Sequence, residues 1–165
     1  AADKGTANHL FMQFADFEIA SFLGAEAEAK RLAEKGFVTQ EQLELMDFKA
    51  LDKFFVSPLY DRMCKSKAMY REKRFSVEES DIVVGGAGKE KILVQGVIDC
   101  FFQNPDETYT VVDYKTDRAG DKNELISRHG AQISFYCAAV QRMTGRPVTK
   151  AVIYSFSIGD EVEVI

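Results

Sequence analysis

The first part of the chain has apolar residues at helical spacing. After Thr6 they recur every three to four positions, at Leu10, Phe11, Phe14 and Phe17. This spacing predicts one helix that begins at a Thr6 cap and ends near Gly24. A second helical pattern follows over residues 25–35 and stops at Gly36.

Two capping signals mark further helices before residue 70. Thr39 and Gln42 form a capping-box pattern, in which each side chain can hydrogen-bond the backbone of the other residue. Ser57 followed by Pro58 supplies an N-cap and a first-turn proline, which predicts a helix to about residue 67. We therefore expect residues 1–70 to be helical.

The pattern changes to that of strands after Tyr70. Extended segments are predicted at residues 74–84, 91–102 and 108–116, separated by turns in GGAGKE and NPDE. A helix over about residues 122–143, closed by Gly145 and Pro147, precedes a strand at 148–157 and a short strand at 161–165. This order predicts an α/β fold with a mixed central sheet flanked by helices. We expect a single domain, 1–165, whose sheet-containing part is residues 71–165.

Charged residues interrupt two of these apolar strands. Alternation places Val111, Asp113 and Lys115 on one face of the third strand, and Asp99 breaks the apolar run of the strand before it. If the NPDE turn pairs the two strands, Asp99 and Asp113 lie nearly opposite each other. Two carboxylates in a semi-apolar site repel unless a cation lies between them, and such an oxygen-rich site suits Mg²⁺. The structural alternative is an Asp113–Lys115 salt bridge at a sheet edge, with Asp99 in a turn.

The composition is that of one globular domain. The chain has 165 residues, 46% of them hydrophobic, and a formal net charge of −5. Its three cysteines are scattered, so neither a zinc site nor an iron–sulfur cluster is expected. Because no apolar run is long enough for a bilayer and no signal peptide is recognised, we expect no membrane partner and a cytoplasmic location. The chain opens AADKGT without an initiator Met, and we expect a fragment of a larger protein.

Five motifs occur in a specific order. They are KGTANHLFMQ near the start, REKRF at residues 71–75, QGVIDCFF around Asp99, VVDYKTD around Asp113, and Gln132-x-x-x-Tyr136 on the following helix. In this combination nearly the whole chain resembles the RecB-like branch of the PD-(D/E)xK nuclease superfamily, and within it the nuclease domains of AddAB-type helicase–nucleases. The resemblance implies a restriction-endonuclease-like core. Two positions depart from the family pattern: Arg74 replaces a proline and His129 replaces an aromatic residue.

The resemblance also implies a role for each motif residue. The implied ligands of a catalytic Mg²⁺ or Mn²⁺ ion are His9, Asp99, Asp113 and the backbone carbonyl of Tyr114. An imidazole ligand suits Mn²⁺ better than Mg²⁺. Lys115 would orient or help to deprotonate the attacking water and offset negative charge on the phosphate. Gln132 and Tyr136 would brace the site or touch substrate phosphate, and Glu72 would be an auxiliary acidic residue.

The residues by themselves leave simpler interpretations open. Without the resemblance, His9 is a solvent-facing histidine on the polar side of its helix. Gln132 and Tyr136 fit an ordinary helix face, with Tyr136 a core residue. Glu72 fits a surface position on a strand.

The net charge does not exclude DNA, because it is unevenly distributed. Residues 62–74 carry six basic residues and one acidic residue, whereas residues 1–60 carry six basic and ten acidic ones. We expect DNA phosphates near basic residues of this run and of the segment after the DYKT strand: Arg71, Lys73, Arg74, Arg118, Lys122 and Arg128. A solvated connector is the alternative for residues 62–74.

The expected function is metal-dependent hydrolysis of DNA by an exonuclease domain. By resemblance, such a domain acts in double-strand break repair and cuts the 3′-terminated strand. Its partners would be DNA, the helicase part of the same chain and an AddB-type subunit. GGAGKE is not a phosphate loop, because Val83 and Glu90 stand where Gly and Ser or Thr are required, so no nucleotide site is expected in this segment. The alternatives are a standalone phage-type exonuclease of this fold and a catalytically silent DNA-binding or subunit-docking module.

Overall fold

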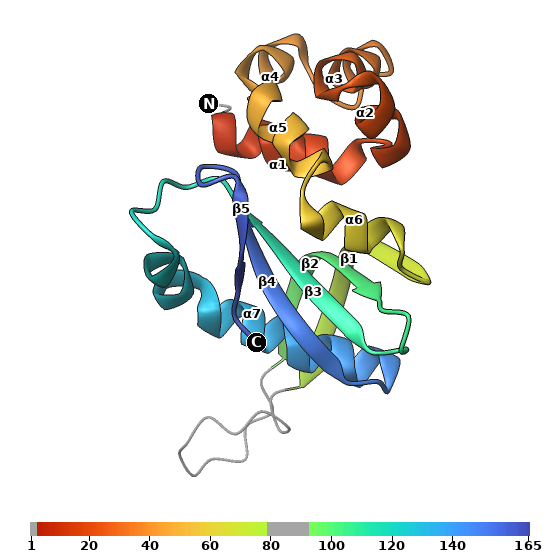
Figure 1. Cartoon of the computed structure of the whole chain (residues 1–165), viewed down its shortest axis with the longest axis vertical. Coiled ribbons are helices and arrows are strands. Elements are labelled where there is room, and N and C mark those ends of the chain that lie inside the picture. The colour runs from red at the N-terminus through yellow and green to blue at the C-terminus, as the bar shows by residue number, and fades with distance from the viewer. Residues whose placement is uncertain (1–2, 79–92) are drawn as a thin grey trace.

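The computed structural model describes residues 3–78 and 93–165. In this part of the chain six short helices come first: α1 (Lys4–Phe14), α2 (Phe17–Leu23), α3 (Ala25–Glu34), α4 (Gln40–Leu45), α5 (Phe48–Phe55) and α6 (Pro58–Cys64). A sheet and one long helix follow: β1 (Ala68–Glu78), β2 (Leu93–Gln103), β3 (Tyr109–Lys115), α7 (Lys122–Thr144), β4 (Val148–Ser155) and β5 (Asp160–Glu163). Figure 1 shows the N-terminal helices gathered at one end of the molecule, above the sheet.

The strands form one mixed sheet in the order β1-β2-β3-β4-β5. β1, β2 and β3 are antiparallel neighbours, β3 and β4 are parallel, and β5 returns antiparallel to β4. Helix α7 makes the crossover that a parallel pair requires. The expected mixed sheet flanked by helices is confirmed.

Two hydrophobic cores lie on the two faces of the sheet. On one face, Val112 and Tyr154 belong to the core formed with helices α1 to α6. On the other face, Val111 and Ile153 belong to the core formed with α7. Neighbours along β3 and β4 thus point to opposite faces, as a strand requires. Because both faces are covered, β3 is buried along almost its whole length.

The capping signals at two of the short helices are confirmed. Thr39 and Gln42 exchange hydrogen bonds as a capping box at the start of α4. Ser57 caps α6, and Pro58 occupies its first turn. These short helices thus begin where local side chains satisfy the first N–H groups.

The single helix expected from Thr6 to Gly24 is wrong. The segment forms two helices, and the cap of the first is Asp3 rather than Thr6. The break falls at Asp16, whose carboxylate accepts two backbone N–H groups and thereby starts α2. An aspartate inside an apolar helical pattern therefore acted as a new N-cap.

The change from helix to strand also falls earlier than expected. α6 ends at Cys64, and β1 begins at Ala68 because that residue pairs with Gln103 at the end of β2. The turn expected at residues 85–90 lies outside the described residues. None of the described helices is long and apolar enough to cross a membrane.

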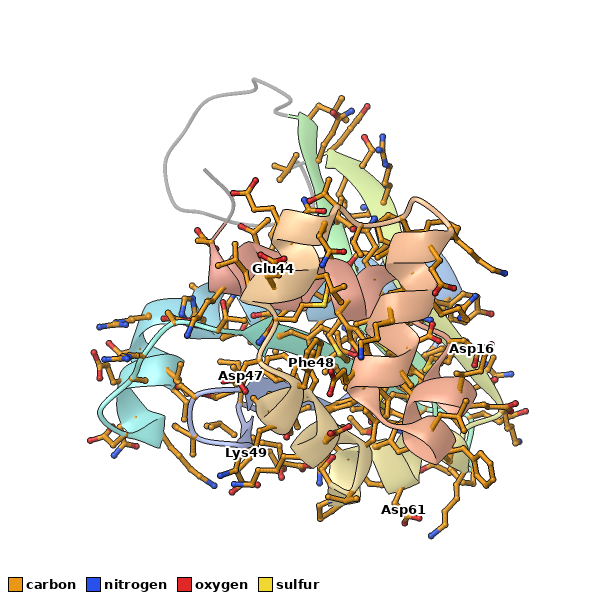
Figure 2. The ribbon with its side chains drawn as sticks, turned by 90° about the horizontal axis from the view of Figure 1, so that it is seen from above. Asp16, Glu44, Asp47, Phe48, Lys49 and Asp61 are labelled. Carbon is orange, nitrogen blue, oxygen red and sulfur yellow. The ribbon has the colours of Figure 1, made fainter. Side chains whose placement is uncertain are left out.

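The outer surface of the helical layer is acidic. Asp16, Glu44, Asp47 and Asp61 are exposed there, with Lys49 close by (Figure 2). This placement follows from the excess of acidic residues over residues 1–60. Such a surface repels the phosphates of a nucleic acid.

One fully buried carboxylate joins α2 to α3. Glu28 on α3 accepts the backbone N–H of Asp16 at 2.9 Å and two N–H groups of the Arg31 guanidinium. Glu26, on the same helix, makes only an exposed ion pair with Lys30 at 3.1 Å. The two glutamates therefore offer a buried and an exposed version of the same interaction.

Glu28→Ala should lower the free energy of unfolding by about 2–3 kcal/mol, because a buried N–H and a guanidinium lose their charged acceptor. Glu26→Ala, the matched control, should cost less than about 0.5 kcal/mol, since exposed helical ion pairs contribute little. Urea unfolding followed by circular dichroism measures both. Equal losses in the two variants would contradict the role assigned to Glu28.

Candidate active site

The candidate site lies where β2 and β3 separate. The ladder between these strands ends at the Cys100–Val112 pair. The next residues in the same register are Asp99 and Asp113. There the Asp99 carboxylate accepts the backbone N–H of Tyr114 at 2.8 Å. The side chain thus satisfies a strand donor and is fixed beside β3.

The alternation of faces is interrupted at the same level. Cys100 belongs to the core beneath the helices and Ile98 to the core beneath α7, although residues two apart on a regular strand share a face. On β1 the residue at this level is Glu72, whose φ of 49° lies in the left-handed region that non-glycine residues rarely adopt. Glu72 is close enough to raise the pKa of Asp99. The irregularity therefore gathers acidic side chains at one point of the sheet.

Asp99 and Asp113 are poorly solvated. Burial, followed by repulsion from Asp113, raises the pKa of Asp99 to about 7. Asp113 is 3% exposed, and its Oδ2 accepts no hydrogen bond from any described residue. Lys115 Nζ lies 2.9 Å from that oxygen and forms an ion pair with it, although the angles between the two groups are not those of a hydrogen bond. Two adjacent, poorly solvated carboxylates, one with an oxygen that accepts no hydrogen bond, are suited to a divalent cation.

Lys115 is held at the site by residues of α7. Its Nζ donates to Gln132 Oε1 at 3.2 Å, and Gln132 Nε2 donates to the Tyr136 hydroxyl at 2.9 Å. Burial, followed by the charges of Asp113 and Asp99, raises the pKa of Tyr136. Both α7 residues therefore face the carboxylates.

His9 reaches the site from α1. The side chain is half-buried, and its ring centroid lies 6.5 Å from that of Tyr114. Burial, followed by the charge of Lys115, lowers the pKa of His9, whereas Asp113 and a backbone hydrogen bond to Tyr114 raise it. The helix thus directs His9 to the end of β3 rather than to bulk solvent.

The expected metal ligands supply suitable atoms without forming a closed cage. Among the described residues, no three His, Cys, Asp or Glu side chains are gathered closely enough to hold a metal ion as they stand. Lys115 lies against Asp113 instead. Carboxylate oxygens, a backbone carbonyl and one imidazole nitrogen nevertheless fit Mg²⁺ or Mn²⁺ in kind. Asp113 Oδ2, which is buried and accepts no hydrogen bond from the described residues, is an oxygen that such a cation would complement.

A glycine on α1 lets this helix approach the site. A Cβ on Gly5 would lie 2.6 Å from Thr116 Oγ1, so a larger residue would require either the Thr116 side chain or the helix to shift. The lack of a side chain at Gly5 therefore lets the helix that carries His9 lie close to Thr116. In the sequence, the only signal of this contact is a glycine within the G-T-x-x-H motif.

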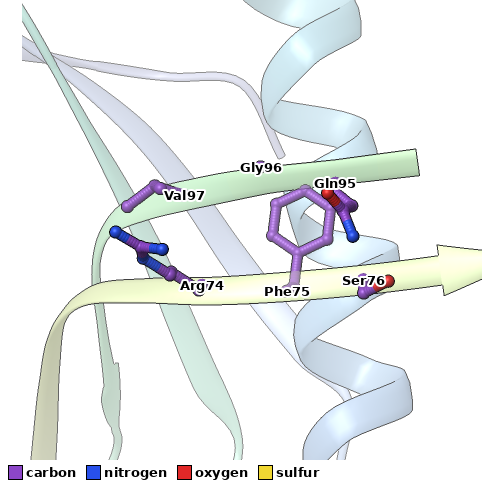
Figure 3. Close-up of a pocket in the computed structure, with 6 residues that line it drawn as sticks. All are labelled: Arg74, Phe75, Ser76, Gln95, Gly96 and Val97. Atoms are coloured by element: carbon purple, nitrogen blue, oxygen red, sulfur yellow. The ribbon is translucent and has the colours of Figure 1, made fainter. Parts of the chain in front are cut away.

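A second glycine supports the α7 side of the site. The Phe75 ring lies on the backbone of Gly96, where a Cβ would be 2.8 Å from two ring atoms (Figure 3). The same ring meets Tyr136 edge-on, with centroids 5.8 Å apart. Phe75 and Gly96 also line a groove of about 470 Å³ between β1 and β2, formed by Arg74, Phe75, Ser76, Gln95, Gly96 and Val97. The groove does not include the carboxylate pair.

Arg71, which is expected to contact DNA, has its guanidinium engaged within the protein. Its guanidinium points into the helical layer, where it donates to the carbonyl oxygens of Met12 and Ala15 and lies 4.0 Å from the centre of the Phe17 ring. A group used in this way is not presented to a phosphate. This geometry therefore does not support the predicted DNA contact of Arg71.

The other basic candidates fall into two groups. Lys122 is paired with Asp160 at 2.7 Å, and Arg128 with Asp117 at 3.2 Å. The remaining candidates are exposed and form no ion pair with another described residue: Lys73, Arg74 and Arg118. The expected basic track is thus reduced to a few cations on β1 and on the loop after β3.

Comparison with known proteins agrees with this geometry. The profile of the PD-(D/E)XK nuclease superfamily matches residues 1–163. Proteins of Geobacillus kaustophilus (strain HTA426) and Geobacillus thermodenitrificans (strain NG80-2), both described as the A subunit of an ATP-dependent helicase/nuclease, are 37% identical over 180 residues and 36% identical over 169 residues. A protein of Alkaliphilus oremlandii (strain OhILAs) with the same description is 32% identical over 172 residues.

These three matches cover 99%, 94% and 98% of this chain, and 14% of each relative. The chain thus spans about one seventh of the length of the relatives it matches. The superfamily match takes in the helical layer, the carboxylate pair and α7 alike. On this coverage and identity, the chain belongs to the PD-(D/E)XK nuclease superfamily.

Proposed function

We propose that this domain is a metal-dependent deoxyribonuclease. The observation that carries the proposal is the meeting of Asp99, Asp113 and Lys115 at the end of β3, with the lysine ammonium 2.9 Å from a buried carboxylate oxygen. A buried carboxylate pair costs stability when it is left unbalanced, and a silent DNA-binding module has no use for one. The intact set therefore supports catalysis.

We assign metal binding to the carboxylates of Asp99 and Asp113, the backbone carbonyl of Tyr114 and the imidazole of His9. A divalent cation held there supplies Lewis acidity and makes a bound water more acidic. Asp99 is already fixed beside β3 by its bond from the Tyr114 N–H. The nitrogen ligand makes Mn²⁺ an acceptable substitute for Mg²⁺.

Lys115 supplies a second, permanent positive charge. An ammonium fixed near the scissile phosphate stabilises the negative charge that develops there, because it needs no reorganisation during the reaction. Gln132 keeps this ammonium in place by accepting a hydrogen bond from it and by donating in turn to the Tyr136 hydroxyl. Glu72, whose pKa is raised by burial, is an auxiliary carboxylate on the β1 side of the same site.

DNA approaches from the β1 side in this proposal. Lys73 and Arg74 are exposed next to Glu72, and Arg118 is exposed on the loop after β3. The acidic outer surface of the helical layer disfavours the opposite approach (Figure 2). A small number of unpaired cations among the candidate DNA contacts that the structure describes suits a domain that receives its strand from a larger neighbour.

We further propose that the domain is the nuclease module of a larger helicase–nuclease. This rests on the relatives described as the A subunit of an ATP-dependent helicase/nuclease, of which the chain spans 14%. The partners would then be DNA, the helicase part of the same chain and a second subunit of the AddB type. The activity would be that of an exonuclease acting on the 3′-terminated strand during double-strand break repair. Release of label from 3′-labelled but not 5′-labelled linear DNA tests that polarity.

Lys115→Ala and Asp113→Asn should each reduce hydrolysis of linear DNA in Mg²⁺ or Mn²⁺ by at least about 100-fold, because the first removes a positive charge near the scissile phosphate and the second removes a carboxylate proposed to hold the cation. Nucleotide release from labelled DNA measures the loss, and circular dichroism checks the fold. Lys150→Ala, which removes a half-buried lysine paired with Glu163, should retain activity and serves as the matched control.

Hydrolysis that persists in EDTA, or in both variants, would contradict metal-dependent catalysis at these residues. Calorimetric titration with Mn²⁺ distinguishes a site that cannot bind the metal from an intact site that is inactive because the helicase is absent. The wild-type chain should bind Mn²⁺, and Asp113→Asn should not.

The double variant Lys73→Ala/Arg74→Ala should weaken DNA binding and flatten its salt dependence. Each lost phosphate contact lowers the slope of log K against log salt by about 0.7–0.9, so the change should be about 1.4–1.8. Fluorescence anisotropy in EDTA at several salt concentrations measures this slope. Lys35→Ala/Lys49→Ala, which removes two exposed lysines of the helical layer, is the control, and an equal effect of both pairs would refute the proposed path.

The metal-free domain should lose stability as the pH rises from about 4 to about 7. The pKa of Asp99 is raised from 3.8 to about 7, so in this window the folded chain keeps a proton that the unfolded chain releases. The corresponding slope is at most about 1.4 kcal/mol per pH unit. Urea unfolding in EDTA should therefore show a shallower fall for Asp99→Asn than for wild type.

His9 contributes the opposite slope, because its lowered pKa favours the neutral ring in the folded state. Its contribution is lost as the pH falls below about 6.5. The informative quantity is thus the difference between wild type and Asp99→Asn at each pH. Parallel curves for the two proteins would show that Asp99 does not titrate in this range.

A further inference from the structure

Arg71 joins the sheet to the first helix. It lies on β1, and its guanidinium donates from Nη1 to Ala15 O at 2.8 Å and from Nη2 to Met12 O at 2.6 Å and Gln13 O at 3.0 Å. The guanidinium carbon also lies 4.0 Å from the centre of the Phe17 ring. One side chain of the sheet therefore contacts the end of α1 and the start of α2.

These contacts suit a guanidinium and no other side chain. The last carbonyl groups of a helix have no partner within the helix and carry partial negative charge. A planar fork can donate to several of them at once while its face lies on an aromatic ring. A lysine ammonium keeps the charge but cannot reproduce both contacts.

The two ends of this contact lie beside the two halves of the candidate site. His9 is three residues before Met12 on α1, about one turn away. At the other end, Arg71 pairs across the ladder with Cys100, the residue after Asp99. The Arg71 contacts therefore fix the helix that carries His9 relative to the strand that carries Asp99.

We propose that Arg71 is a positioning residue, which sets the distance between His9 and the carboxylate pair of Asp99 and Asp113. The inference rests on the proposed metal-dependent function of that site. Arg71 itself touches neither the metal nor DNA and acts through α1. The break between α1 and α2 belongs to the same arrangement, because it leaves Ala15 in an extended conformation with its carbonyl free to accept from Arg71.

Arg71→Lys tests the inference by Mn²⁺ affinity, measured by calorimetry on the 165-residue chain without DNA. Loss of a group that orients a metal ligand typically weakens binding about 10–100-fold, and we expect a weakening of at least about tenfold. Arg62→Lys is the matched control, because Arg62 also joins the helical layer to the sheet, through Glu161 at 2.7 Å. It should leave the Mn²⁺ affinity within about twofold of wild type.

A double-mutant cycle with His9 separates positioning from general damage. If Arg71 acts through His9, Arg71→Lys should cost no further Mn²⁺ affinity once His9→Ala is present. Additive losses would overturn the inference, and so would an unchanged affinity in Arg71→Lys. Weaker DNA binding in EDTA with normal Mn²⁺ affinity would also overturn it and would restore Arg71 as a DNA contact.

Two further measurements keep the test decisive. If Arg71→Lys does not fold, Phe17→Leu removes the ring beneath the guanidinium, together with its edge contacts to Phe54, Phe55 and Tyr60, and leaves Arg71 itself unchanged. A loss of Mn²⁺ affinity in that variant that disappears in the His9→Ala background supports the inference, and an unchanged affinity opposes it. Asp113→Asn tests the site itself. If this variant retains Mn²⁺ binding and hydrolysis, the proposed function fails. If it loses both, but the effects of Arg71→Lys and His9→Ala on Mn²⁺ affinity are additive, only the role of Arg71 is refuted.

Discussion

The structure depends on the close approach of two carboxylates at the point where β2 and β3 part. Asp99 and Asp113 repel each other in a poorly solvated place, and the chain compensates with the Tyr114 N–H on one side and the Lys115 ammonium on the other. β2 and β3 separate at this level, and the alternation of faces along β2 is interrupted beside Glu72. Gln132 on α7 accepts a hydrogen bond from Lys115. Each of these features places a side chain at or beside the carboxylate pair. A buried charge pair that lowers stability is retained where a function requires it.

The sheet and the carboxylate pair were predictable because they follow from strong local patterns. Alternation along residues 108–116 gives the two faces of β3, and an aspartate inside an apolar strand is rare enough to stand out. The capping box at Thr39 and the Ser57-Pro58 pair likewise act through neighbours in the chain. The order and spacing of the five motifs then indicated the nuclease family, and the candidate role of His9 follows from that resemblance.

The parts that could not be predicted depend on contacts between distant segments. The sequence around Arg71 has the pattern of a solvated basic run, and only the fold shows that α1 ends against it. The same holds for Lys122, which forms an ion pair with Asp160 on β5, and for Arg128, which forms one with Asp117 on the loop after β3. The helix break at Asp16 was not predicted for a related reason. An aspartate that caps a new helix and an aspartate within a helix give the same sequence pattern until the next helix is placed.

The site draws on both ends of the chain. His9 comes from the first helix, whereas Gln132 and Tyr136 come from the last one, and the carboxylates between them lie on strands that pair across the middle. Such long-range contacts form late, after the loops that separate them have closed. The candidate site is therefore incomplete until α1, the central strands and α7 have all packed together.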